Sequence, residues 1–321
     1  MNWMKRILLL GAVLGCIFAP ALAQTTETPP PDGTTTPTEI LATLPPPERP
    51  TARTTLSIGA IDVQLYFDDI KQGGVGVIHV VGDGVTAARA EWLGDIIPFF
   101  PARDDGLFAI LSANIEQTSR EYDLTVYVDT AVGTSSASTR VRVGQGGFVR
   151  STFTVPTDRS YLIDPEIERA EFARLYAVFE DNIAPRQWDE TGFAMPIFGE
   201  YTSPFGELRL LNEVVETRHT GWDMRATVGV PVQASAAGTV AFAGVMDIRG
   251  NYVIVDHGQG VFSGYAHFSQ IHVTRGQEVT AGQVLGMTGN TGRSSGPHLH
   301  WEMNINGDWV DPRTVSRTWL P

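Results

Sequence analysis

The sequence is poor in cysteine, and its single cysteine, Cys16, lies close to the N-terminus. The surrounding segment has the layout of an export signal, with a short basic start, an apolar run from Ile7 to Phe18 and a small-x-small cleavage site ending at Ala23. Cleavage there would remove the only thiol, which excludes disulfides and thiolate chemistry for the mature chain. We therefore predict a signal peptide over residues 1–23 and secretion across the cytoplasmic membrane to the periplasm or cell envelope.

Two alternatives remain for this N-terminal segment. Lipid anchoring at Cys16 is a minor alternative, because Val13-Leu14-Gly15-Cys16 is a loose lipobox. Apolar residues continue beyond the cysteine, which favours cleavage instead. An uncleaved membrane anchor is the second alternative, although the run is shorter than the ~20 apolar residues that span a bilayer.

Positive charge is also scarce. Lys and Arg number 23 against 36 Asp and Glu, which gives a net charge of −13. An acidic surface repels nucleic acid and anionic lipid, so we expect no nucleic-acid partner. Long apolar runs are missing after residue 24, so the mature chain is expected to have no transmembrane segment.

Two regions with different compositions follow the signal. Residues 24–50 are rich in Thr and Pro and have little apolar surface to bury, so they are predicted to form a linker. Residues 51–155 contain short alternating runs separated by Gly-, Asp- and Ser-bearing turns, which is typical of a β-sandwich. The predicted strands are Ile61–Phe67, Val75–Val81, Leu107–Ile115, Tyr122–Thr130, Thr139–Val143 and Phe148–Val155. His79 has no second ligand nearby and is interpreted as a packed or edge residue.

A helical linker is predicted over residues 156–191. Its helix spans Asp164–Asp181, where the first residue can act as the cap, Pro165 suits the first helical position, and apolar residues recur at helical spacing. The chain then returns to strand-like runs and Gly-rich turns over residues 192–321. All histidines except His79 lie in this last region, so chemistry is expected there.

Two short motifs of this region contain metal-ligand residue types. The first is His219-Thr220-Gly221-Trp222-Asp223, and the second is His298-Leu299-His300. In a strand, His298 and His300 project from one face while Leu299 points away. One of these histidines could bind a metal with His219 and Asp223. Two imidazoles and one carboxylate would leave a fourth position on Zn²⁺, as in catalytic zinc sites.

A zinc site of this kind would activate a water molecule and polarise a scissile carbonyl. The sequence has no His-Glu-x-x-His helix that could supply a glutamate base. His267 and His298 are the remaining candidates. Either could accept the proton of the water, and either could stabilise the tetrahedral oxyanion.

Residues Gly192–Pro312 closely resemble the lysostaphin-type (LytM-like) zinc endopeptidases. The matching blocks, in order, are Thr202–Gly206, His219–Asp223, Gly229–Val232, Ala236–Val240, Gly250–Gly258, Tyr265–His267, Gly289–Gly292, Gly296–Glu302 and Val310–Pro312. A match of this length with its blocks in order is specific. It identifies residues 192–321 as a peptidase domain of this type.

The resemblance implies a role for each residue of the site. His219, Asp223 and His300 correspond to the ligands of one zinc ion, and His267 and His298 to the two catalytic histidines. The implied fold is an antiparallel β domain with an open groove, and the implied substrates are stem peptides or cross-bridges of peptidoglycan. Residues 51–155 more loosely resemble the immunoglobulin-like β domains that precede some secreted peptidases of this type. The predicted fold class is therefore mainly β, with a linker helix between two β domains.

A different class of function is the main alternative. Some relatives have lost metal ligands and act as non-hydrolytic cell-wall binding proteins or as activators of other peptidoglycan hydrolases. In this sequence all the expected positions are filled, which favours an active metalloendopeptidase. The sandwich could still contact a protein partner of the cell envelope.

Overall fold

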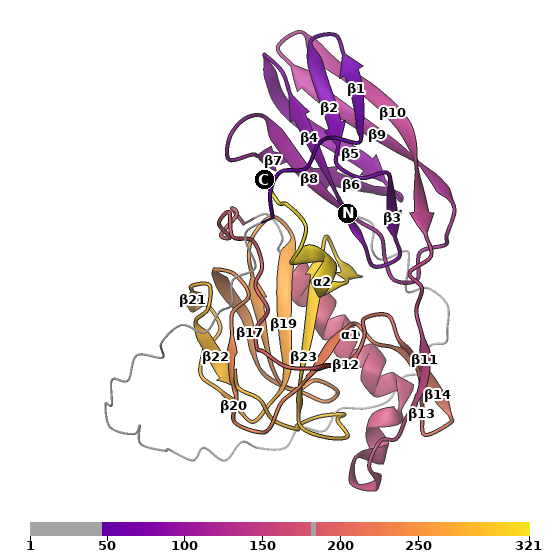
Figure 1. The fold of residues 1–321 in the computed structure, drawn as a ribbon, viewed down its shortest axis with the longest axis vertical. Coiled ribbons are helices and arrows are strands. Elements are labelled where there is room, and N and C mark those ends of the chain that lie inside the picture. The colour runs from indigo at the N-terminus through magenta and orange to yellow at the C-terminus, as the bar shows by residue number, and fades with distance from the viewer. Residues whose placement is uncertain (1–46, 181–183) are drawn as a thin grey trace, which may run out of the picture. The chain divides into compact units, whose positions relative to one another are not determined.

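The computed structural model describes residues 47–180 and 184–321 (Figure 1). The predicted signal peptide, Cys16 and most of the predicted Thr/Pro-rich linker lie outside the described residues. Among the residues described, no helix combines the length and apolar character needed to span a membrane. The structure is mostly β, which confirms the predicted fold class.

The first β region contains two five-stranded sheets. One sheet has the order β1 (Thr54–Ile58), β2 (Ile61–Leu65), β4 (Val75–Val81), β8 (Leu107–Ser112) and β7 (Phe100–Pro101). The other has the order β3 (Asp69–Lys71), β10 (Gly133–Gly144), β9 (Glu121–Thr130), β5 (Val85–Trp92) and β6 (Asp95–Pro98). Alternate residues of β2 and β9 point inward, and both sheets contribute to one apolar core. This arrangement is a β-sandwich, while its immunoglobulin-like character stays a prediction.

The strand predicted at Phe148–Val155 does not join the sandwich. It forms the shorter β11 (Arg150–Phe153), which pairs in parallel with β13 (Leu208–Leu211) in the second half of the chain. The ladder of the sandwich ends at Gly144, and Gly147 adopts a positive φ of 70° that turns the chain away. The alternating pattern therefore predicted a strand correctly but not its partner.

His79 is fully buried in β4. Its ring nitrogens contact the guanidinium of Arg49, at 2.8 Å, and the backbone carbonyl of Asp105. Burial lowers the pKa of His79. Arg49 also forms an ion pair with Asp104 at 2.9 Å. His79 is therefore a packed histidine, and the last residues of the predicted linker are fixed to the sandwich.

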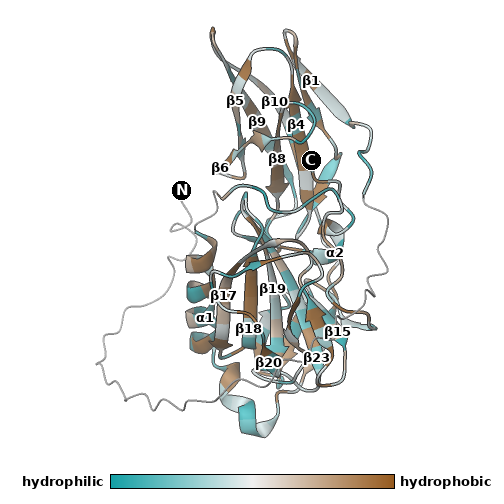
Figure 2. Ribbon diagram, turned by 90° about the vertical axis from the view of Figure 1, so that its left-hand side faces the viewer, coloured by the Kyte–Doolittle hydropathy of each residue, from teal (hydrophilic) through white to brown (hydrophobic). Residues whose placement is uncertain are grey.

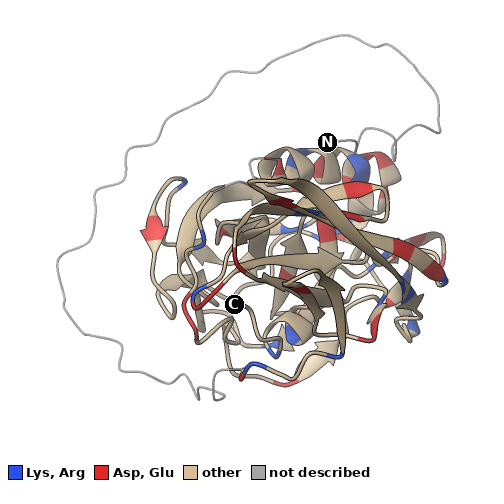
Figure 3. Cartoon of the chain, turned by 90° about the horizontal axis from the view of Figure 1, so that it is seen from above, with Lys and Arg blue, Asp and Glu red and all other residues tan. Residues whose placement is uncertain are grey.

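The predicted helix is present as α1 (Pro165–Phe179), directly after a short 3₁₀ helix, η2 (Thr157–Ile163). Asp164 caps α1, accepting a hydrogen bond from the backbone N–H of Glu166 at 2.9 Å. Leu175 and Phe179 are buried against the C-terminal β region. The helix also carries both acidic and basic residues along its length (Figure 3).

The second β region is built around an antiparallel eight-stranded sheet. Its order is β12 (Tyr201–Ser203), β15 (Gly221–Arg225), β23 (His298–Ile305), β19 (Val261–Phe268), β18 (Gly250–Asp256), β17 (Gly238–Met246) and β21 (Glu278–Val279), with β24 (Asp308–Val310) pairing with β23. Two three-stranded sheets accompany it: β16 (Pro231–Gln233), β22 (Val284–Met287) and β20 (Gln270–Ile271), and β11, β13 and β14 (Val215–Arg218). The helix α2 (Pro312–Val315) follows β24.

The two faces of the eight-stranded sheet differ in character. On one face, α1 lies beside β17 and β18 (Figure 2), and Phe179 packs in a cluster with Tyr252 and Phe262. On the other face, Leu299 and Trp301 of β23 are fully buried in a larger apolar cluster. Residues at even positions of β23 therefore face the α1 side, while odd positions form the opposite core.

Candidate metal centre

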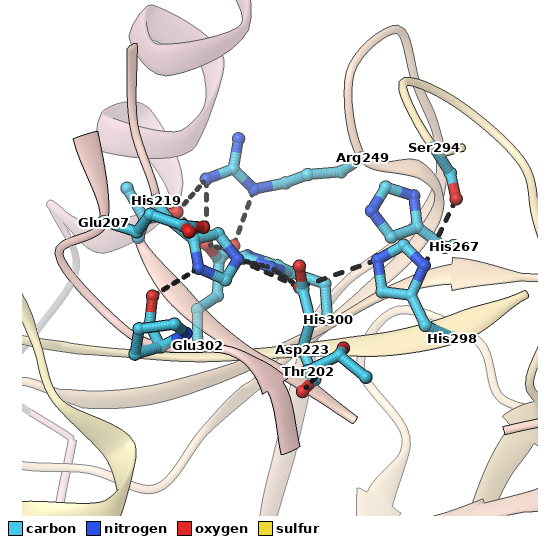
Figure 4. Close-up of polar contacts among 12 residues, drawn as sticks. Thr202, Glu207, His219, Asp223, Arg249, His267, Ser294, His298, His300 and Glu302 are labelled. Carbon is cyan, nitrogen blue, oxygen red and sulfur yellow. Dashed lines mark hydrogen bonds and ion pairs between the residues drawn. The ribbon is translucent and has the colours of Figure 1, made fainter. Parts of the chain in front are cut away.

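Two neighbouring strands bring Asp223 and His300 together. Asp223 of β15 lies directly opposite His300 of β23 in the antiparallel register, so their side chains project from the same face. His219 lies just before β15 and points toward both (Figure 4). All three residues are buried, with exposed fractions of 4 to 7%. The structure thus places the three sequence-predicted metal ligands in one cluster.

The three residues each direct one donor atom toward a common point. His219 Nε2 lies 2.9 Å from Asp223 Oδ1 and 2.9 Å from His300 Nδ1. His300 Nδ1 lies 2.9 Å from Asp223 Oδ1. The three atoms all lie within 4.8 Å of one another. This spacing suits ligands that share one small cation.

The outward-facing nitrogens show which tautomer each ring adopts. His219 Nδ1 donates to the backbone carbonyl of Pro204 at 2.7 Å, and His300 Nε2 donates to the carboxylate of Glu302 at 3.1 Å. The two nitrogens that face each other therefore carry lone pairs, which repel unless a proton or a metal ion lies between them. Two imidazole nitrogens and a carboxylate are a donor set typical of zinc. The residues present therefore fit a metal ion.

Charges around the cluster set the protonation of its members. Burial lowers the pKa of His219 to about 4, so its ring is neutral at neutral pH and free to act as a ligand. Burial would raise the pKa of Asp223, but its contacts with His219 and Arg209 outweigh this effect and hold the pKa well below its usual value. Burial also opposes charge on His300, yet hydrogen bonds to Asp223 and Glu302 outweigh it and raise its pKa. The carboxylate of Asp223 is therefore ionised and available as a ligand.

Two further histidines lie beside the cluster. His267 Nδ1 donates to the carbonyl of Thr291 at 2.7 Å, and His298 Nδ1 donates to the carbonyl of Gly296 at 2.8 Å. Their ring centroids are 4.6 Å apart, and His298 Nε2 lies 3.5 Å from Asp223 Oδ1. Because each Nδ1 is bound to a carbonyl, Nε2 is the ring atom at which either histidine could accept or donate a proton. Burial, together with His298 and His300, holds the pKa of His267 well below its usual value.

The packing of the loop beside His267 explains why residue 250 is a glycine. His267 has a φ of 63°, in the left-handed region that few side chains adopt. The loop that holds its ring contains Thr291, which packs against Gly250. A Cβ at Gly250 would lie 2.3 Å from Thr291 Oγ1, so only glycine allows this approach.

Comparison with known proteins agrees with this geometry. Residues 217–312 match peptidase family M23. This part of the chain is a peptidase M23 domain.

The DD-carboxypeptidase/endopeptidase Mpg of Neisseria meningitidis serogroup B is 42% identical over 122 residues, which cover 37% of this chain and 28% of the relative. The peptidoglycan DD-endopeptidase ShyA of Vibrio cholerae is 43% identical over 89 residues, covering 28% of this chain and 21% of that protein. The chain therefore spans less than a third of the length of either relative.

A solved structure resembles more of the chain than the M23 domain alone. A Pseudomonas aeruginosa protein assigned to peptidase M23 is 28% identical with a TM-score of 0.57. The match covers 78% of this chain and 95% of that chain. The similarity therefore extends beyond residues 217–312.

A cavity next to the M23 site is lined in part by residues from outside the matched domain. It has a volume of about 50 Å³. Phe153 of β11 and Glu168 and Phe172 of α1 line one part of it, and His219, His267 and His300 line another. Segments that precede the matched residues therefore contribute to the walls of the cavity beside the metal cluster.

The 3₁₀ helix before α1 is also attached to the M23 domain. Arg159 Nη1 donates to the backbone carbonyls of Asn290, Gly292 and Ser294 at 2.8, 3.1 and 3.1 Å. These residues form the loop that precedes His298. One side chain of the linker thus holds a loop at the edge of the site.

Several residues around the M23 site were not found from the sequence. Arg209 donates to Asp223 Oδ2 at 2.7 Å and to Glu207 at 2.8 Å, so it fixes the carboxylate from behind. Arg249 and Glu171 form a buried ion pair at 2.9 Å. Arg209, Arg249 and Glu171 all lie outside the two metal-ligand motifs. The only available signal was that Arg249 directly precedes the matching block at Gly250.

Other polar and aromatic residues of the C-terminal region have clear environments. Glu302 accepts a hydrogen bond from His300 and forms an ion pair with Arg249 at 2.6 Å. Tyr265 and Trp301 are fully buried in the core on the opposite face of the sheet, so they pack and do not line the site. His257 is buried, and its ring bonds to the Ala237 carbonyl and to Ser263. His272 is exposed.

Proposed function

We propose that this chain is a zinc metalloendopeptidase that hydrolyses peptide bonds in peptidoglycan stem peptides or cross-bridges. The observation that carries the proposal is the convergence of His219, Asp223 and His300 beside two histidines whose Nδ1 atoms are fixed to backbone carbonyls. The relatives named as DD-endopeptidases support the substrate class. The filled ligand positions favour this function over that of a non-hydrolytic binding protein or activator.

His219, Asp223 and His300 would hold the zinc ion. When bound there, zinc supplies Lewis acidity that activates a water molecule and polarises the peptide carbonyl. His267 and His298 would serve as proton carriers at Nε2, because their Nδ1 atoms are fixed to backbone carbonyls. Either ring, when protonated, could also donate a hydrogen bond to the developing oxyanion. Arg209 keeps Asp223 ionised and oriented for this purpose.

Segments from outside the matched residues border the proposed substrate site. Phe153 of β11 and Glu168 and Phe172 of α1 line the cavity beside the metal cluster. Arg159 of η2 holds the loop Asn290–Ser294 at the edge of the site, so a shift of η2 would widen the access of a peptide while α1 stays in place. We place this activity in the periplasm or cell envelope, where the sandwich could contact a protein partner.

The deciding experiment is digestion of purified peptidoglycan by the chain without its predicted signal, with the released fragments identified by mass spectrometry. A chelator and the variant His219→Ala are the controls. Chelator-sensitive release of peptide-cleaved fragments would support the enzyme and identify the bond that is cut. Binding to peptidoglycan without release, by folded and zinc-loaded protein, would instead favour the non-hydrolytic alternative.

A further inference from the structure

One carboxylate of α1 reaches the backbone beside the active site. Glu171 is 2% exposed and lies outside the residues that match peptidase family M23. Its Oε2 accepts a hydrogen bond from the backbone N–H of Ile248 at 2.6 Å. Its Oε1 accepts from the backbone N–H of Arg249 at 3.2 Å and from Arg249 Nη1 at 2.9 Å. Glu171 therefore holds both the main chain and the side chain of Arg249.

Arg249 connects Glu171 to a metal ligand. Its Nε donates to Glu302 Oε1 at 2.6 Å, and its Nη2 donates to Glu302 Oε2 at 2.9 Å (Figure 4). Glu302 is fully buried, and its Oε2 accepts the hydrogen bond from His300 Nε2. A continuous path of charged hydrogen bonds thus runs from α1 to His300. Because Glu302 receives the Nε2 proton, His300 keeps the Nδ1 lone pair that faces Asp223 and His219.

Arg249 also supports His267. The backbone N–H of His267 donates to the carbonyl of Arg249 at 2.9 Å. This bond fixes His267 in its left-handed conformation, with a φ of 63°. Glu171 accepts a hydrogen bond from the backbone N–H of Arg249, the residue whose carbonyl binds His267. One carboxylate therefore fixes the peptide segment on which the orientation of His267 depends.

Aromatic rings surround the guanidinium of Arg249 and offer it no conventional hydrogen-bond acceptor. Its guanidinium lies 5.2 to 5.6 Å from the ring centroids of Phe172, Tyr252 and Trp309, in a fully buried environment. A buried guanidinium needs acceptors for its donors, and within this ring of aromatics Glu171 binds Nη1. If that acceptor were lost, the guanidinium would shift toward another one. Its two-pronged contact with Glu302 would then change.

We propose that Glu171 is a positioning residue of the active site that acts through Arg249 on both His300 and His267. The inference rests on the proposed function, because it assigns His300 to the metal and His267 to proton transfer. On this view α1 is part of the catalytic apparatus, which extends beyond the M23 domain. The competing view is that Glu171 only attaches α1 to the sheet.

The test compares three variants of the whole mature chain with the wild type. Glu171→Gln removes the charge with little change of shape, and Glu171→Asp keeps the charge but shortens the side chain. Glu166→Gln is the matched control, since Glu166 lies on the same helix, is exposed and pairs with exposed Arg169. The dissociation constant for Zn²⁺ is measured by competition with a chromophoric chelator. The visible spectrum of the Co²⁺-loaded protein and the thermal unfolding midpoint are recorded for the same samples.

We expect Glu171→Gln to weaken Zn²⁺ binding about tenfold, at the lower end of the effect of losing an outer partner of a metal ligand. Its Co²⁺ spectrum should shift, because His300 no longer sits in the same orientation. Glu171→Asp should fall between Glu171→Gln and the wild type, and Glu166→Gln should match the wild type. If Glu171→Gln does not fold, the dissociation constant and spectrum of Glu171→Asp decide the matter.

Two results would overturn the inference. In the first, Glu171→Gln is less stable but binds Zn²⁺ and Co²⁺ as the wild type does, so Glu171 only attaches the helix. In the second, the control weakens binding as much as Glu171→Gln does, so the effect is one of net charge. A wild-type protein that binds no Zn²⁺ would instead refute the proposed function, which keeps the two failures distinguishable.

Discussion

The sandwich and the M23 region bury different kinds of side chain. Among the described residues, His79 and Ser112 are the buried polar side chains of the sandwich strands. The M23 region and α1 bury many more, including Glu171, Arg249 and Glu302. Buried charges stabilise a fold poorly because desolvation offsets their attraction. The comparison teaches that the sandwich core is almost wholly apolar, whereas the second core accepts the desolvation of buried charges around the metal cluster.

The same contrast exists within one strand. In β23, His300 and Glu302 lie on the face toward α1, while Leu299 and Trp301 lie in the apolar core behind it. The apolar face anchors the strand, and the polar face presents the ligand. Substitutions in the two cores should therefore change different properties, and the following predictions test this separation.

The largest effect is expected from removal of a metal ligand. His219→Ala removes one of the three converging donor atoms, so bound zinc and hydrolysis of peptidoglycan should be lost together. Metal content by elemental analysis and fragment release measure the two properties. His272→Ala is the matched control, because His272 is exposed and lies outside the motifs, and it should keep both. Stoichiometric zinc in folded His219→Ala would remove His219 from the ligand set.

Loss of His267 should separate catalysis from metal binding. His267→Ala is expected to keep its zinc while the rate falls about 10²–10³-fold, as when one oxyanion contact is lost. His267→Asn is the companion variant, because asparagine tolerates the left-handed backbone at this position better than alanine does. Rates and zinc content are measured for both. Near-normal turnover in either variant would refute the catalytic assignment.

The same leucine substitution in the two cores should have different consequences. Leu124 in the sandwich and Leu299 in β23 are both fully buried. Either change to Ala should lower the free energy of unfolding by about 2–5 kcal/mol. Leu124→Ala should leave the Zn²⁺ dissociation constant unchanged, but Leu299→Ala should weaken it severalfold, since Leu299 lies between His298 and His300. Equal Zn²⁺ affinities in the two folded variants would contradict the proposed division of roles.

The smallest effect is expected at the linker. Arg159→Ala removes the hydrogen bonds to the carbonyls of Asn290, Gly292 and Ser294, so η2 should move away from this loop more often. The initial rate of fragment release should rise severalfold. Arg169→Ala, an exposed change on α1, should leave the rate unchanged. A lower rate in Arg159→Ala would show that the segment assists catalysis and does not obstruct it.

Local features of the fold could be predicted from the sequence. The alternation of Val75–Val81 gave the bounds of β4 correctly, and Pro165 with the preceding aspartate marked the start of α1. The strand at Phe148–Val155 was predicted too, but its pairing with β13 was not. Alternation reports that one face is buried and does not identify the neighbouring strand.

The candidate site shows the same limit. The spacing of His298 and His300 predicted a shared face, and the structure places His219 and Asp223 beside them. The ion pair of Glu171 with Arg249 joins residues 78 positions apart, so neither motif nor periodicity could indicate it. The contribution of α1 to the cavity beside the site was missed for a related reason, because it depends on where α1 packs. Contacts of this kind follow from tertiary packing alone.

The position of Glu171 also limits how this protein can be divided or recombined. A fragment cut at residue 192, or a chimera that grafts residues 217–312 onto another protein, would omit α1 and leave Arg249 without the Glu171 acceptor. Glu302 would then be the remaining carboxylate partner of Arg249. We therefore expect a transferable fragment to need α1 in addition to the residues that match the family.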